Sequence, residues 1–304
     1  MNFDYGNTLI RALQLTWKHK ILWVLMMLPM VLSFLMFPFM FGFLFLLDAD
    51  IPDTTGIIIS IALIIVVLII FLASIAFTVI AMSSSTLGIV RIENGASSLN
   101  FMGLIKDSLA YFWRSLAALL IIQLSLGLVF TVFFLLTFVL SIVTLGLASI
   151  CIQPIMLLLT PFIFLVLGVM EAAQTAIIAE NLNAIDAIKR AIQVVREHVW
   201  KYVILTLIIY FGTSILMSFI VFPLMLPMFF FPIFMESGIE ISNQLLTFFP
   251  LAFMCLFFPV LAFFSGITQT FMKASLDITY LQLTRPTENQ TLHLEEKPQV
   301  DGTN

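Results

Sequence analysis

Five stretches of this sequence contain no Asp, Glu, Lys or Arg and are long enough to cross a lipid bilayer. An α-helix needs about 20 apolar residues to span the hydrocarbon core, and one charge at its centre costs roughly 2.5–3.5 kcal/mol. The five stretches are Ile21–Leu47, Thr54–Val90, Ser115–Met170, Tyr202–Met235 and Ile241–Met272. Hydrophobic residues make up 62% of the 304 residues and charged residues 10%, whereas about a quarter of the residues of a soluble domain are charged. The sequence therefore predicts an integral membrane protein.

The longest stretch, Ser115–Met170, has 56 residues and would form a straight helix of about 84 Å, more than twice the thickness of a bilayer. It must fold into a hairpin, and we place the turn between Thr144 and Pro154, where Gly146 favours a reversal of the chain. The prediction is an all-α, polytopic transmembrane helical bundle of six spans within residues 1–284. The spans lie near residues 21–46, 57–82, 116–142, 149–172, 202–230 and 246–272. Residues 285–304 are polar and are predicted to form a disordered cytoplasmic tail.

The basic residues are confined to alternate loops. All 13 Lys and Arg lie before the first span, between the second and third, between the fourth and fifth, or after the sixth. The charged residues of the other loops are all acidic. Because cytoplasmic loops are enriched in Lys and Arg, this distribution predicts a protein of the inner (cytoplasmic) membrane with both termini in the cytoplasm. The formal charge of −4 provides no basic surface for nucleic acid, which is therefore not an expected partner.

Each predicted hairpin follows a short amphipathic segment. In Leu182–Trp200, the residues Ile185, Ile188 and Ile192 recur at helical spacing, and Asn183 is positioned to cap the helix. Similar segments precede the other two hairpins, which indicates three repeated units. We expect these helices to lie on the cytoplasmic face of the lipid bilayer, with basic and Trp side chains contacting anionic lipid headgroups. The alternative is a docking face for a cytoplasmic or membrane protein partner. The expected anchors are Arg11, Lys18, Lys106, Arg114, Lys189, Arg190, Arg196, Trp17, Trp113 and Trp200.

Glu171 and Gln174 are the candidate intramembrane polar site, because Glu171 directly follows an uncharged stretch. Ionisable groups inside a membrane mark proton or ion pathways. A simpler interpretation places Glu171 at the cytoplasmic interface, paired with a basic residue of the neighbouring loop. The three histidines, His19, His198 and His293, lie in separate segments without metal-ligand spacing, and neither a nucleophile elbow nor a phosphate-binding loop is present. We therefore expect no catalytic residues, no metal, no cofactor and no enzymatic activity.

Two further features leave a transport function open. Broken helices expose backbone groups to the substrates of secondary transporters, and polar side chains within spans can line a pathway. The residues concerned are Pro29, Pro161, Pro259, Gln123, Gln174 and Gln269. The first interpretation of function is a structural or accessory membrane component that helps assembly or envelope maintenance. The alternative is a small-solute transporter or permease subunit.

Part of the chain resembles a group of bacterial membrane proteins. The residues that carry the resemblance are Gln153-Pro154, Ala172–Thr175, Glu180–Leu182 and Ala187–Ile192. They are similar to a pattern in uncharacterised bacterial six-span integral membrane families allied to the membrane domain of glycerophosphoryl diester phosphodiesterase. Those proteins also place a cytoplasmic helix before each hairpin, so the resemblance implies the same layout here.

Overall fold

The computed structural model describes residues 3–36, 39, 53–96, 98–144, 146–236 and 243–284, and the regular elements in these residues are all helices. They are α1 (Tyr5–Lys18), α2 (Ile21–Phe34), α4 (Asp53–Glu93), α5 (Phe101–Ser108), the 3₁₀ helix η1 (Leu109–Tyr111), α6 (Phe112–Val143), α7 (Leu147–Ala179), α8 (Ala184–Glu197), α9 (Val199–Glu236) and α10 (Asn243–Thr284). The predicted all-α class is confirmed. The polar tail predicted for residues 285–304 and most of the second half of the first predicted span lie outside the described residues.

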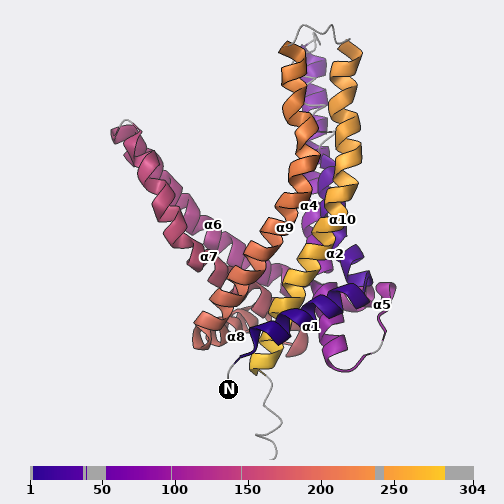
Figure 1. The fold of residues 1–304 in the computed structure, drawn as a ribbon, viewed down its shortest axis with the longest axis vertical. Coiled ribbons are helices and arrows are strands. Elements are labelled where there is room, and N and C mark those ends of the chain that lie inside the picture. The colour runs from indigo at the N-terminus through magenta and orange to yellow at the C-terminus, as the bar shows by residue number, and fades with distance from the viewer. Residues whose placement is uncertain are drawn as a thin grey trace, which may run out of the picture.

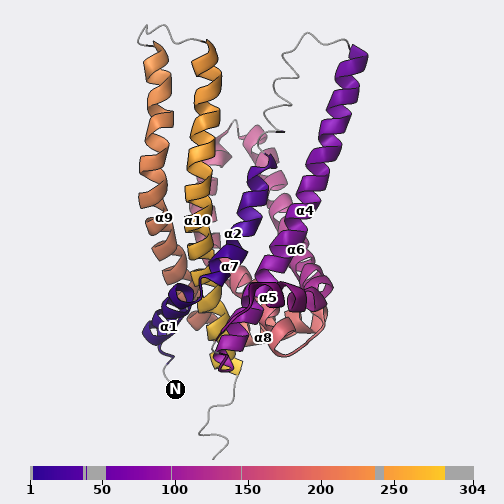
Figure 2. The same cartoon turned by 90° about the vertical axis from the view of Figure 1, so that its right-hand side faces the viewer.

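The long helices form arms that diverge from a common base. The base is the end of the molecule that contains α1, α5, α8 and the last turns of α4, α7 and α10 (Figure 1). The arm made of α6 and α7 leans away from the other long helices in Figure 1, and α4 leans away from α9 and α10 in Figure 2. The chain enters the described structure at the base and leaves it there, at the end of α10.

Five of the described helices are long and apolar enough to cross a membrane, and α1 with α2 makes a sixth span if this pair, bent by 81°, counts as one. The five candidates are Thr54–Glu93, Phe101–Val143, Pro154–Ala179, Val199–Pro223 and Leu256–Thr284. The chain is therefore a multi-pass helical membrane protein. Each of the five overlaps one predicted span, but α4, α7 and α10 continue past the predicted ends of their spans into the base.

The turn between α6 and α7 is tighter than predicted. Helix α6 ends at Val143 and α7 begins at Leu147, with Gly146 in the left-handed region at a φ of 93°. Glycine adopts this conformation without the steric cost that a Cβ atom brings. Pro154 lies inside α7 instead of ending the turn, since a continuing helix keeps nearly all backbone groups hydrogen-bonded in an apolar environment.

Two of the three base helices begin with a side-chain cap. Asp4 accepts a hydrogen bond from the backbone N–H of Asn7 at the start of α1 (2.9 Å), and Asn100 accepts one from Met102 at the start of α5 (3.1 Å). The cap predicted at Asn183 is wrong in one respect. Asn183 occupies the N-cap position of α8, but its side chain makes no capping hydrogen bond.

A close approach between α2 and α10 holds two arms together near the base. A Cβ atom added to Gly266 of α10 would lie 2.7 Å from the backbone carbonyl oxygen of Trp23 in α2. Backbone atoms cannot move aside as a flexible side chain can, so this position requires glycine. On α9, a Cβ atom at Gly212 would meet nothing within 4 Å.

We expect Gly266→Ala to lower the thermal unfolding midpoint (Tm) of the detergent-solubilised protein by roughly 3–10 °C, because overpacking costs about 1–3 kcal/mol. Gly212→Ala is the matched control and should leave Tm unchanged or slightly raised, since alanine favours a helix over glycine. Differential scanning fluorimetry measures both variants. Equal Tm values for the two would contradict the packing of α2 against α10.

Candidate functional site

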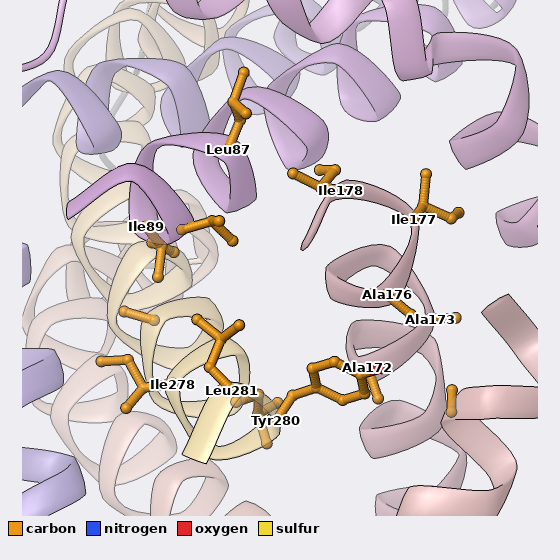
Figure 3. Packing of buried hydrophobic residues seen from close by; sticks show 14 of the residues in the cluster. Leu87, Ile89, Ala172, Ala173, Ala176, Ile177, Ile178, Ile278, Tyr280 and Leu281 are labelled. Carbon is orange, nitrogen blue, oxygen red and sulfur yellow. The ribbon is translucent and has the colours of Figure 1, made fainter. Parts of the chain in front are cut away.

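Small side chains bring the last turns of α4, α7 and α10 together in the base. The fully buried residues at this contact are Ala172, Ala173 and Ala176 of α7, Ala274 of α10, and Ser83, Ser84 and Ser85 of α4. Small residues allow helix backbones to approach closely within a membrane protein. Figure 3 shows the apolar cluster that results, with Leu87 and Ile89 from α4, the alanines from α7, and Ile278 and Leu281 from α10.

Charged side chains lie beside this apolar cluster. The Lys273 Nζ atom of α10 lies 2.6 Å from the Glu171 Oε2 atom of α7, and their side chains are 2% and 15% exposed. One turn further into the base, the Thr175 hydroxyl of α7 donates a hydrogen bond of 2.7 Å to Asp277 Oδ1 of α10, and Asp277 is completely buried. We call Glu171, Thr175, Lys273 and Asp277 the charge cluster. Its ion pair is largely withdrawn from solvent, so its two charges depend on each other for stabilisation.

Both contacts of the charge cluster join α7 to α10. The residues of both contacts are 102 positions apart, Glu171 with Lys273 and Thr175 with Asp277, and the preceding residues, Met170 and Met272, are separated by the same number. The polar interactions of the base therefore also join helices that are distant in the sequence.

A cavity of about 570 Å³ lies directly beside the ion pair. Its lining comes from α2, α4, α6, α7, α9 and α10. Six methionines contribute to the wall, and they are Met26, Met30, Met36, Met82, Met170 and Met272. Glu171 and Lys273 form the charged end, and Gln123 and Gln269 add amide groups. This volume lies within the usual range for small-molecule sites, which are mostly apolar with a few polar groups.

The structure separates the two residues of the predicted polar site. Glu171 lines the cavity and pairs with Lys273 of α10, not with a residue of the loop that follows its own helix. Gln174 is buried and turns toward α6, where its amide Nε2 donates a hydrogen bond to the backbone carbonyl of Ser115 (3.3 Å). Gln174 therefore joins two helices and does not line the cavity.

Sequence reasoning missed Lys273 and Asp277, because it placed both residues in the segment after the last span. Two signals were available. The two residues are four positions apart, so they lie on one face of a helix, and Met272-Lys273 repeats the pattern of Met170-Glu171 with opposite charge.

The predicted surface anchors fall into two groups. Lys18, Lys106, Lys189, Arg196 and the tryptophans Trp17, Trp113 and Trp200 are exposed. The other three have partners within the protein: Arg11 pairs with Glu93 (2.9 Å), Arg114 donates a hydrogen bond to Asn181 Oδ1 (2.8 Å), and Arg190 lies 3.5 Å from Glu180. These three therefore also make contacts between different segments of the base.

The described residues contain no group of three His, Cys, Asp or Glu side chains that could hold a metal ion. What the arrangement can do is bind a molecule with one polar end, since the cavity has a charged end and an apolar wall. Comparison with protein-family models, curated proteins and solved structures finds no match for this chain.

Proposed function

We propose that this chain is an accessory component of the membrane, and that it holds one amphiphilic molecule in the cavity beside the charge cluster. The observation that carries the proposal is the polarity of that cavity. It has a single charged end, made by Glu171 and Lys273, and a wall dominated by methionine and other apolar side chains. An amphiphile has the same division between a polar end and an apolar chain.

The length of the cavity supports this proposal. On α10 its lining runs from Ser265 to Leu276 and on α4 from Phe71 to Met82, which corresponds to roughly 16 Å along each helix. An extended chain of about ten carbon atoms fits within that length. Methionine side chains adapt to irregular apolar surfaces, so such a wall accepts a flexible chain without a single fixed conformation.

We further propose that the base faces the cytoplasm, and that the chain acts in assembly or maintenance of the inner membrane envelope. The segregation of all Lys and Arg to one side supports the orientation, and so does the position of both ends of the described chain at the base. The layout expected from the bacterial six-span families agrees with it. Glu171 and Lys273 are then near the cytoplasmic edge of the membrane, and the methionine wall extends from them toward its centre.

The orientation predicts which single cysteines react with an impermeant thiol reagent in intact cells. In a background without Cys151 and Cys255, we expect Ser237→Cys to react in intact cells and Asp186→Cys, at the start of α8, to react only after the membrane is opened. Immunoblotting after maleimide labelling measures both. The reverse pattern would contradict the proposed orientation but not the cavity.

The presence of a bound molecule is tested by filling the cavity with a larger side chain. Met82→Trp places a larger side chain in the cavity wall, whereas Met102→Trp makes the same change at an exposed position of α5. Native mass spectrometry of the wild type, released from its detergent micelle, should show one retained amphiphile per chain. We expect Met82→Trp to reduce the occupied fraction at least fivefold, with Met102→Trp equal to the wild type. An unchanged occupied fraction in Met82→Trp would contradict the proposal.

A small-solute transporter is the second candidate, and Gln123 and Gln269 favour it because their amide groups face the same cavity. Uptake of labelled solutes into proteoliposomes tests it. Uptake that Gln269→Leu abolishes would favour transport over retention of one bound molecule.

We also propose that the chain is not an enzyme. Turnover of a lipid phosphodiester that Glu171→Gln abolishes would contradict that proposal.

A further inference from the structure

The charges beside the cavity do not balance. With all three side chains ionised, Glu171 and Asp277 contribute two negative charges against one positive charge from Lys273, and Lys273 and Asp277 are almost completely buried. The other ion pairs of the base are balanced within themselves, since Arg11 pairs with Glu93, Arg91 with Asp107, and Arg190 with Glu180. The charge cluster therefore needs one additional positive charge to be neutral.

Lys273 is placed to form an ion pair with either Glu171 or Asp277. Its ammonium contacts Glu171 across the helix interface, and Asp277 follows four residues later on the same face of α10. The second carboxylate oxygen of Asp277, Oδ2, is buried and has no hydrogen-bond partner among the described residues. Because residues four apart are neighbours on one face of a helix, the Lys273 side chain is within reach of that oxygen, and pairing with it would release Glu171 toward the cavity.

We propose that the molecule held in the cavity is an amphiphile with a single positive charge, whose ammonium group pairs with Glu171 while Lys273 pairs with Asp277. This inference rests on the proposed function, because it specifies the polar end of the same ligand. In the occupied state, two acids face two cations. Each charge then has a partner in a site that is largely removed from water.

Other headgroups leave a charge without a partner. An anionic headgroup would bind Lys273 and leave both Glu171 and Asp277 uncompensated. A zwitterionic headgroup brings equal and opposite charges, so the excess negative charge of the charge cluster remains. Gln123 and Gln269 fit a cation as well, because their amide oxygens accept hydrogen bonds from an ammonium group.

The test compares three probes with the same ten-carbon chain. They are decylammonium, decanoate and decylphosphocholine, each added to the protein in phosphatidylcholine nanodiscs, with binding to empty nanodiscs subtracted. Isothermal titration calorimetry gives the affinity. We expect decylammonium to bind at least tenfold more tightly than either of the others. Glu171→Gln should reduce its affinity at least tenfold, and the exposed control Glu197→Gln should not.

The outcomes separate this inference from the proposed function. Equal affinity for the three probes, with all three lost in Met82→Trp, would leave the cavity site in place and overturn the preference for a cation. Preference for decanoate or decylphosphocholine would overturn it too. Failure of every probe to bind would instead contradict the proposed function itself. Should Glu171→Gln not fold, Asp277→Asn replaces it, with the same tenfold loss expected because Lys273 then stays with Glu171.

Discussion

Replacing Lys273 with Met will lower Tm by roughly 6–20 °C, because it leaves the buried Asp277 carboxylate and the largely buried Glu171 carboxylate without a counter-charge. Removal of one partner from a buried ion pair costs about 3–5 kcal/mol, and each kcal/mol corresponds to roughly 2–4 °C in a domain of this size. The methionine side chain is nearly as long as that of lysine, so the cavity wall and the packing of α10 change little. The fall in Tm therefore reflects the loss of the positive charge.

The other member of the ion pair should be less sensitive. Glu171→Gln keeps a polar group beside Lys273, and Asp277 remains one helical turn away as a counter-charge, so we expect a smaller fall in Tm than in Lys273→Met. Lys189→Met, at an exposed position of α8, is the matched control and should change Tm by less than about 2 °C, as surface substitutions do. If Lys273→Met behaved like this control, the burial of the charge cluster would be contradicted.

The second large effect is expected in α8, whose buried side is made of Ala187, Ala191, Val194 and Val195. Ala191 is completely buried, whereas its neighbour Ile192 is 49% exposed. Ala191→Asp places an unpartnered charge against α7, which costs several kcal/mol. We expect it to lower Tm in detergent by roughly 5–15 °C, or to prevent recovery of folded protein.

Ile192→Asp carries the same chemical change one residue further along. It should lower Tm by less than about 3 °C in detergent, because the side chain does not face the core. The variant should also bind vesicles of anionic lipid less tightly if this side of α8 contacts the bilayer. A larger loss of stability in Ile192→Asp than in Ala191→Asp would contradict the placement of α8.

The sequence predicted the helices well because their signal is long and simple. Stretches without charges identify spans by the cost of placing a charge in hydrocarbon, and five long helices are found where such stretches lie. Three spans were predicted to end near residues 82, 172 and 272, and the helices that contain them continue to Glu93, Ala179 and Thr284. Glu171 and Lys273 neutralise each other across two helices, so neither ends the helix that carries it.

The sequence alone also does not predict which residues of α8 face the protein. The isoleucine pattern identified a helix with two unlike faces. The buried residues of α8 are Ala187, Ala191, Val194 and Val195, whereas Ile188 is partly buried against the core and Ile185 and Ile192 are exposed. Close packing against α7 favours alanine at the contact, while larger apolar side chains on the outside suit a helix that lies beside lipid. Hydrophobicity alone does not distinguish a protein neighbour from a lipid neighbour.

The presence of a cationic amphiphile in the cavity is tested most directly by locating the bound molecule. A ten-carbon amine with a photoreactive diazirine at the end of its chain is added to the protein in nanodiscs, irradiated, and its attachment sites are found by peptide mass spectrometry. We expect labelling within the cavity wall, at Met30, Phe71 or Ser265, and its loss when unlabelled decylammonium competes. Labelling spread over the exposed outer residues of α6, such as Leu128 and Leu135, and insensitive to the competitor would show that the cavity holds no ligand.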